Sequence, residues 1–337
     1  MYAFITFVTL ISNLMKQLFV FVCLGLIFLS SCVDDSHSKV KAVSPRIEIG
    51  HFDHDFFGMD SVNFDDDLLM LMKQYPDFFK IGMNHGMLKS RFFDTEIREL
   101  YMAVDSTFSN TKELDAEIHR AFQYYYHHFE NHDSLKIYTW VSNFERLDPI
   151  LVSQNTLLIS LDMYLGSDSH FYKTAPDYIK QRFDKMYILS DLFRSYFSSN
   201  IPLSDNHTLL ASMLYYGKIH YLISLMLPNY DSHVIMGYTK NKMQWCLRNE
   251  SNIWAYFVEN KLLFSSNQQN KMRFIDDAPF SKFYTSFDRE SPGRIGQWIG
   301  IKIVQAYMNS HPDLTLTDLI REIDAQKILR ESRYKPK

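Results

Sequence analysis

Residues 205–230 read DNHTLLASMLYYGKIHYLISLMLPNY, and this stretch predicts the central helix around which the chain is organised. Asn206 or Thr208 can cap the start of the helix, and Pro228 closes its end. A helix over residues 208–227 would be about 30 Å long at 1.5 Å per residue. Its apolar residues recur at helical spacing, so we expect this face to be part of the core.

The middle of this helix aligns with the zinc-protease motif H-E-x-x-H. In that motif two histidines at i and i+4 bind zinc, and the glutamate is the general base. The five aligned positions here are Tyr216, Gly217, Lys218, Ile219 and His220. One ligand and the base are therefore missing, and Lys218 lies on another face. We interpret His220 as a hydrogen-bonded core residue and Gly217 as a place where another backbone passes close by.

A metallopeptidase with a divergent zinc site is the alternative interpretation. A second helix is expected over residues 240–264, where Glu250 or Glu259 is placed to supply a third zinc ligand. His220 and Glu250 make two ligands, whereas a catalytic zinc has three protein ligands and a water. A zinc-bound water in such a site would be poorly held and not deprotonated. We therefore expect no catalytic residue, metal or cofactor, and regard Tyr216, His220 and Glu250 as a vestigial site.

The composition is that of a globular protein. Of the 337 residues, 46% are hydrophobic and 15% are aromatic, which is enough to build a large core. The formal net charge is −4, without a basic excess, so nucleic acid is not expected as a principal partner.

The first 32 residues predict a bacterial lipoprotein signal. Lys16 precedes an apolar run that ends in Leu-Ser-Ser-Cys at Cys32. Residues 1–14 carry no positive charge, so we predict that Met15 is the true start. The alternative is a transmembrane helix across residues 1–31.

Cys32 is the predicted lipidation site. Palmitate or another acyl chain contributes about 0.8 kcal/mol per buried methylene, so more than one chain gives a stable membrane anchor. Residues 33–44 would form a polar tether, and residues 45–337 a single domain. Cys246 would be the remaining thiol of the mature chain, which excludes an intramolecular disulfide.

Three stretches predict a small sheet ahead of the central helix. Residues 46–57 alternate like a strand, residues 135–142 are β-rich, and residues 149–165 suggest a hairpin around Gln154 and Asn155. Strands directly ahead of a long helix match the layout of zincin-type domains. The first stretch also contains a possible metal cluster, formed by His51, Asp53, His54 and Asp55. Alternation would send neighbouring side chains to opposite faces, which favours a solvated edge.

Helical spacing recurs in most of the remaining chain. We expect helices over residues 63–74, over residues 88–129 in at least three pieces, and over residues 177–197 and 316–329. A second histidine-rich group consists of His119, His127, His128 and Glu130. Adjacent histidines on a helix point about 100° apart, so surface or half-buried positions are favoured over a metal site.

A glycine-rich stretch, ESPGRIGQWIG over residues 290–300, precedes another predicted helix. A phosphate-binding loop would need a preceding strand and a G-K-[ST] ending, and both are missing here. We therefore predict that Gly293, Gly296 and Gly300 permit close helix packing.

Several short motifs occur in a characteristic order: YPDFF at 75–79, YYGK at 215–218, MQWC at 243–246, NIWAYF at 252–257, APF at 278–280, ESPGRIG at 290–296 and YKP at 334–336. Together they make the chain similar to the gliding-motility lipoprotein GldB family of Bacteroidota. The resemblance implies a lipoprotein needed for gliding, a process tied to type IX protein secretion. It also implies a distant similarity to predicted zinc proteases with an intact H-E-x-x-H. It supplies no catalytic residue.

We thus expect a mainly α (α+β) fold, a zincin-like helical domain with a small β-sheet preceding the central helix. The expected function is that of a non-catalytic lipoprotein in the cell envelope, lipid-anchored to a membrane, facing the periplasm or the exterior, and serving the gliding or secretion proteins. Tyr75, Phe78 and Phe79 would dock a partner if exposed, although burial is favoured. A sugar- or peptide-binding lipoprotein is a third interpretation and would need an open aromatic-lined cleft.

Overall fold

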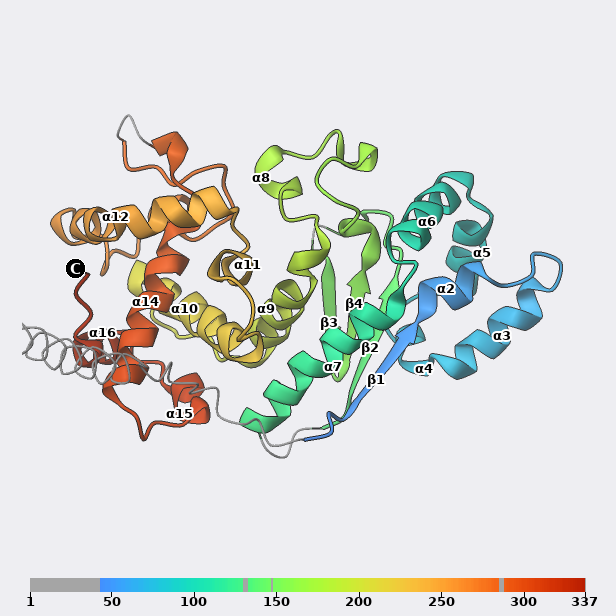
Figure 1. Cartoon of the computed structure of the whole chain (residues 1–337), viewed down its shortest axis with the longest axis horizontal. Coiled ribbons are helices and arrows are strands. Elements are labelled where there is room, and N and C mark those ends of the chain that lie inside the picture. The colour runs from blue at the N-terminus through green and yellow to red at the C-terminus, as the bar shows by residue number, and fades with distance from the viewer. Residues whose placement is uncertain (1–42, 130–132, 147, 285–287, 337) are drawn as a thin grey trace, which may run out of the picture. The chain divides into compact units, whose positions relative to one another are not determined.

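The computed structural model describes residues 43–129, 133–146, 148–284 and 288–336. The described residues form fifteen α-helices and one four-stranded sheet, which confirms the mainly α (α+β) fold (Figure 1). Residues Ala42–Lys337 make one compact unit. The predicted signal with Met15 and Cys32, most of the predicted tether, and Glu130 lie outside the described residues. None of the described helices combines the length and apolar character needed to cross a membrane.

The sheet has the strand order β1-β2-β4-β3, with β1 and β3 at its edges. The strands are β1 (Ile47–His51), β2 (Leu135–Trp140), β3 (Ile150–Ser153) and β4 (Thr156–Ser160). β2 runs parallel to β1 and β4, and its central residue Ile137 pairs with Ile49 on one side and Leu157 on the other. β3 and β4 are antiparallel and form the predicted hairpin, in which Gln154 has a φ of 50°.

The predicted strand over residues 46–57 is only partly right, because it ends at His51. The helix α2 (Phe52–Phe57) follows at once. Phe52 and Phe56 are four residues apart, so the aromatic spacing of this segment also suits one buried helix face. Both side chains are buried, and the Phe52 ring lies 3.7 Å from the Phe78 ring between centroids.

The aromatic residues after α3 (Phe64–Gln74) are core residues. Tyr75 and Phe78 are buried, and Phe79 is half-buried within α4 (Pro76–Phe79). The Tyr75 ring meets the ring of Tyr138 on β2 edge-on, at 5.1 Å between centroids. Burial, the favoured interpretation, is confirmed for Tyr75 and Phe78, so these two side chains are not exposed for docking.

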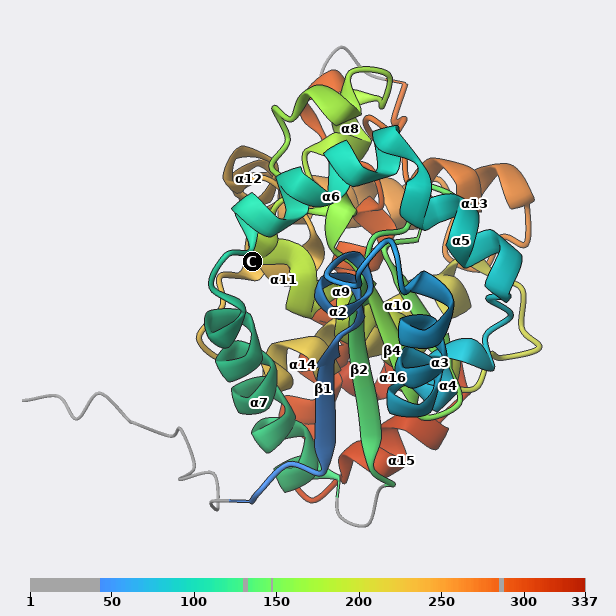
Figure 2. The same cartoon turned by 90° about the vertical axis from the view of Figure 1, so that its right-hand side faces the viewer.

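Residues 85–128 form three helices, as expected: α5 (His85–Phe93), α6 (Thr95–Thr107) and α7 (Thr111–His128). α7 lies along the edge strand β1, with α3 and α4 on the other side of the strands (Figure 2). The helix predicted over residues 177–197 is instead broken into α8 (Asp177–Lys180), the 3-10 turn η3 (Lys185–Tyr187) and α9 (Ile188–Asn200). The break follows from Asp184, whose side chain caps η3 by accepting from the Met186 amide. α9 then packs against β3 and β4.

The central helix is α10 (Leu209–Met226), capped by the Thr208 side chain, which accepts from the Ala211 amide. The remaining helices are α11 (Ser232–Met236), α12 (Lys240–Glu259), α13 (Gln268–Phe274), α14 (Ile295–Ser310), α15 (Leu316–Arg321) and α16 (Ala325–Ser332). The single helix predicted over residues 316–329 is wrong, because Asp324 caps a new helix by accepting from the Gln326 and Lys327 amides.

α10 and α14 cross in closest contact at two glycines. A Cβ atom on Gly217 would lie 2.3 Å from the carbonyl carbon of Gly300, and one on Gly300 would lie 1.8 Å from the Met213 oxygen. The predicted close backbone approach at Gly217 and the predicted close packing at Gly300 are both confirmed. Only glycine at these positions lets the two helix axes come this near.

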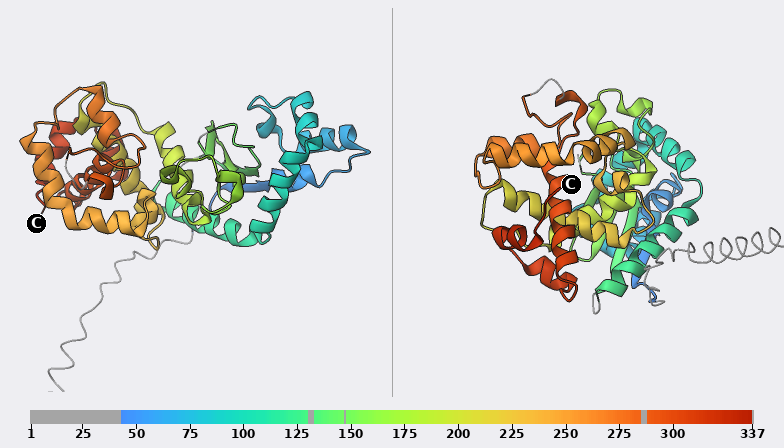
Figure 3. Two further views of the ribbon diagram at one scale, coloured as in Figure 1. Left: turned by 90° about the horizontal axis from the view of Figure 1, so that it is seen from above. Right: turned by 60° about the vertical axis from the view of Figure 1, so that its left-hand side comes forward.

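α10 belongs to two hydrophobic cores. Its first half packs with the C-terminal helices, and its second half packs with the core that covers the sheet. Figure 3 shows the corresponding arrangement from above, with the C-terminal helices (orange to red) on one side of α10 and the sheet with the N-terminal helices on the other. α10 is therefore buried on nearly all sides, as expected for a helix that is apolar all round.

Candidate functional site

His220 lies on α10, and each of its two ring nitrogens faces an oxygen atom. Its Nδ1 lies 3.2 Å from the Ile235 carbonyl oxygen, and its Nε2 lies 2.9 Å from Oε1 of Gln297. Gln297 is fixed in turn, because its amide donates to the Ile275 carbonyl at 2.7 Å. The side chain is fully buried, and burial followed by the charge of Arg194 lowers the pKa of His220 to about 3. His220 is therefore neutral at physiological pH and joins α10 to α11 and α14.

Glu250 is held by residues other than His220. It accepts a hydrogen bond of 2.9 Å from the Tyr334 hydroxyl and lies 3.7 Å from the Lys302 ammonium. Glu259 is exposed. Among the residues that the structure describes, no group of three or more histidines, cysteines or acids has the placement of a metal site.

Lys218, two residues before His220 in the sequence, is a buried cation. Its ammonium donates to the Glu322 carbonyl, in the short link between α15 and α16. Burial lowers the pKa of Lys218 to about 8, with the charge of Glu322 opposing the shift. This lysine therefore ties α10 to the C-terminal helices and is not available as a general base toward His220.

A partly buried arginine–aspartate cluster lies within electrostatic range of Tyr216 and His220, with Asp277 at its exposed end. Its members are Arg182, Asp191, Arg194, Asp277 and Arg294. Asp191 Oδ1 accepts from Arg182 at 3.0 Å and from Arg194 at 2.7 Å. Asp277 Oδ1 lies 2.9 Å from Arg294 and 3.4 Å from Arg182. The cluster thus joins the segment before η3, α9, and the residues before α14.

The charges in this cluster determine the protonation states around it. Burial alone would raise the pKa of Asp191, but Arg182 and Arg194 outweigh it and hold that pKa below its usual range. Burial, then the neighbouring Arg182, lowers the pKa of Arg194 to about 10. Sequence reasoning missed this cluster because its residues come from four segments between 182 and 294, and no local pattern joins them.

The possible metal cluster of the first strand, which was not the favoured interpretation, is a polar network. His51 Nδ1 lies 3.2 Å from the Thr139 hydroxyl, and Thr139 donates to Asp53 at 2.5 Å. The other ring nitrogen lies 3.2 Å from Asp115 on α7. The predicted solvated edge is wrong for Asp53, which is 6% exposed, because the chain turns into α2 and carries it inward. His54 is exposed and Asp55 accepts from the Tyr75 hydroxyl at 2.6 Å.

The second histidine-rich group behaves as expected. His119 and His128 are exposed and His127 is half-buried, which confirms the surface or half-buried interpretation. The rings of His127 and His128 lie 5.1 Å apart between centroids, with an angle of 67° between their planes.

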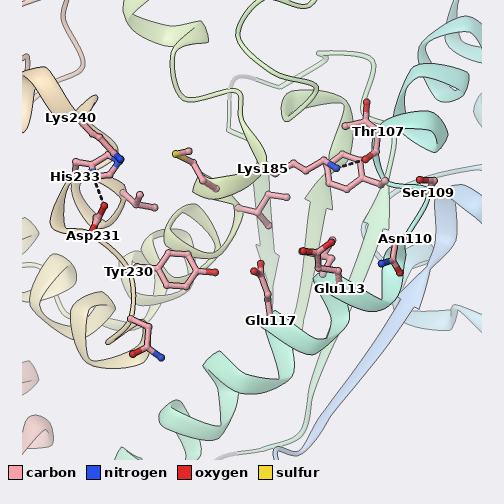
Figure 4. Close-up of a pocket in the computed structure, with 16 residues that line it drawn as sticks. Thr107, Ser109, Asn110, Glu113, Glu117, Lys185, Tyr230, Asp231, His233 and Lys240 are labelled. Carbon is pink, nitrogen blue, oxygen red and sulfur yellow. Dashed lines mark hydrogen bonds and ion pairs between the residues drawn. The ribbon is translucent and has the colours of Figure 1, made fainter. Parts of the chain in front are cut away.

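An open cleft of about 720 Å³ lies between α7 and the loops around η3 and α11 (Figure 4). Acidic side chains enter from α7, at Glu113 and Glu117, while Lys185 and Lys240 come from the other side. Tyr230 points toward Glu117, and burial followed by the Glu117 charge raises the pKa of Tyr230 to about 12. The cleft has the size of a ligand-binding site. Its residues span 107 to 240, so no sequence motif marks it.

Comparison with known proteins gives one informative match. The model of the family described as gliding motility protein GldB matches residues 34–336. No curated protein and no solved structure matches the chain, so the zincin-like part of the expected fold stays a prediction. The match spans nearly all of the 337 residues and includes α10, the arginine–aspartate cluster and the cleft. The chain belongs to the GldB family of gliding motility proteins.

Proposed function

We propose that this protein is a membrane-anchored, non-catalytic lipoprotein that supports gliding motility and the associated type IX secretion machinery. The family match carries the link to motility. The surroundings of His220 support a non-catalytic role, because this side chain is fully buried with an oxygen atom against each ring nitrogen, and Glu250 is held elsewhere by Tyr334 and Lys302. A catalytic zinc needs three protein ligands and an open position for water.

Metal analysis separates this proposal from a divergent metallopeptidase. The full-length protein, purified in detergent, should contain far less than one zinc per chain. Stoichiometric zinc that disappears in His220→Gln would overturn the non-catalytic proposal. Glu250→Gln should support gliding in a strain lacking the wild-type protein, because Glu250 serves Tyr334 and Lys302. Loss of gliding with normal protein levels in this variant would favour the peptidase.

The anchor is tested separately at Cys32. Mass spectrometry of the mature amino terminus should find an acylated Cys32, and Cys32→Ala should release the protein from membranes and abolish gliding. An unmodified chain that begins at Met1 would refute the lipoprotein signal.

A peptide- or sugar-binding lipoprotein is the second candidate function, and the cleft in Figure 4 favours it. Phe108 and Tyr230 give the cleft two aromatic side chains, and its lining includes both positively and negatively charged residues. Glu117→Gln with Lys240→Gln should then reduce gliding while the unfolding midpoint stays close to that of the wild type. Glu259→Gln is the matched control, because Glu259 is exposed and lies outside the cleft. Unchanged gliding in the cleft variant would remove this candidate.

A further inference from the structure

The cleft of Figure 4 carries two carboxylates on one wall. Glu113 and Glu117 are four residues apart on α7, which places both on one side of the helix, and both line the cleft. Among the residues that the structure describes, neither side chain forms an ion pair. Tyr230 points toward Glu117 but stays neutral, because burial and then the Glu117 charge raise the pKa of Tyr230 to about 12. This wall therefore presents negative charge that its neighbours leave uncompensated.

The lysine across the cleft from this wall is engaged by its own surroundings. Lys185 donates to the Thr107 carbonyl, and its ammonium lies 4.8 Å from the centre of the Phe108 ring. Figure 4 shows this ammonium directed toward Thr107 rather than toward the α7 carboxylates. Lys185 thus joins the end of α6 to η3 and leaves the two glutamates open to an external cation.

The far end of the cleft has the opposite charge. Lys240 is the first residue of α12, is exposed, and forms no ion pair with any residue that the structure describes. A helix N-terminus already carries a partial positive charge, so a lysine there is unfavourable without a nearby anion. Asp231 lies at the same end, but its carboxylate faces the His233 ring at 3.6 Å. A carboxylate from a ligand would supply the partner that Lys240 lacks.

Apolar side chains connect the two charged regions. Leu114, Ile188 and Val234 line the cleft and are buried, and Phe108 adds an aromatic ring. A neutral sugar would pair with neither charged region. A peptide segment supplies charged side chains of both signs together with apolar groups between them, so the lining as a whole favours a peptide.

We propose that the cleft binds an extended peptide segment, with a lysine or arginine side chain against Glu113 and Glu117 and an acidic group against Lys240. This inference rests on the binding function proposed above for the cleft, and it selects peptide over sugar. The volume of about 720 Å³ lies within the range of small-ligand sites, so the cleft takes a short segment rather than a folded partner.

Fluorescence anisotropy with the full chain in detergent tests this inference, with labelled peptide pools as the probe. Each pool contains one lysine and one glutamate, in both orders, separated by one to four residues drawn from alanine, leucine and serine, with blocked ends. Matched pools carry glutamine in place of the lysine, of the glutamate, or of both. The doubly charged pool should bind about fivefold more tightly than either singly charged pool, because each replacement removes one ion pair.

Two variants separate the contributions of the charged regions. Glu113→Gln combined with Glu117→Gln should remove the preference for lysine and keep the preference for glutamate, whereas Lys240→Gln should do the reverse. Glu259→Gln is the control, since this residue is exposed outside the cleft, and it should bind every pool as the wild type does. The exchanged side chains are exposed or half-buried, so each variant should fold, and circular dichroism checks this.

Equal binding of all pools, or no binding of any, overturns the inference, and so does binding of maltotriose in their place. The gliding test of the cleft gives a separate answer. Reduced gliding in Glu117→Gln with Lys240→Gln, without peptide binding to the wild type, would keep the binding function and overturn this inference. Charge-dependent peptide binding with unchanged gliding would support this inference and remove the cleft from the motility function.

Discussion

The α10–α14 crossing and the turn at Gly237, directly after α11, both depend on the missing side chain of glycine. The atoms that lie against the glycine differ between the two places. At Gly217 and Gly300 the neighbouring helix backbone fills the space completely. At Gly237 guanidinium nitrogens border it, and two of those nitrogens lack acceptors among the described residues. Glycine thus lets a helix backbone come close at the crossing and lets guanidinium groups come close at Gly237. A glycine in the sequence can indicate that another group approaches the backbone. Only the structure shows whether that group is a helix backbone or a charged side chain.

Among the variants that test this comparison, Gly300→Ala should change the unfolding free energy most. Its methyl group would lie 1.8 Å from the Met213 oxygen, so the two helices must separate. We expect a loss of unfolding free energy of about 4 kcal/mol or more, or failure to fold. Chemical denaturation followed by circular dichroism measures it. A loss below about 1 kcal/mol would show that the crossing is loosely packed.

Asp191→Asn tests the charged region. Asp191 is buried and pairs with Arg182 and Arg194, so neutralising it leaves two half-buried cations poorly compensated. The expected loss in unfolding free energy is about 3 kcal/mol. Asp177→Asn is the matched exchange at a 93% exposed side chain paired with Lys180, where we expect about 0.5 kcal/mol or less. Similar losses at both positions would contradict the importance of the arginine–aspartate cluster.

Lys218→Met tests a buried charge that lies outside this cluster. The folded-state pKa of Lys218 is about 8 and the ordinary value is 10.5. Between these pH values the unfolded chain holds a proton that the folded chain has lost. The unfolding free energy of the wild type should therefore contain a component that rises from pH 8 to 10.5. Lys218→Met should remove that component and stabilise the protein at pH 7 by about 1 kcal/mol. Denaturant titrations across this pH range measure both effects, and identical pH profiles for the two proteins would refute the depressed pKa.

Gly86→Ala should have the smallest effect and serves as the reference for the other glycines. Gly86 lies in the first turn of α5, and its nearest neighbour to an added Cβ is the Asn84 side chain, at 3.5 Å. Alanine has the higher helix propensity, so we expect a gain of about 0.5 kcal/mol. A clear destabilisation by Gly86→Ala in the same denaturation assay would show that contacts of the added methyl group do not explain the larger loss expected at Gly300.

The sequence predicted the features that depend on local spacing. The apolar period of α10, its Thr208 cap and the close approach at Gly217 and Gly300 all follow from short-range patterns, as do the hairpin at Gln154 and the three helices before β2. The errors occurred where one capping side chain interrupted a continuous period. Asp184 and Asp324 each start a new helix within a stretch predicted as one.

The site could be predicted only in part. That His220 is a core residue followed from the apolar face around it, but its partners Ile235 and Gln297 are distant in sequence. The cleft and the arginine–aspartate cluster each combine residues more than 100 positions apart. Single charged residues such as Arg182 carry no local signal that they will be buried, because their partners arrive from later segments.

The burial of α10 in both cores has a consequence for biogenesis. α10 ends at Met226, whereas its main partner α14 begins at Ile295. A growing chain that has completed α10 still lacks the surface that covers the first half of this helix, since those residues pack with later segments. The first half of α10 therefore stays uncovered until the segment of α14 has been made, and during that interval this apolar helix needs shelter from aggregation.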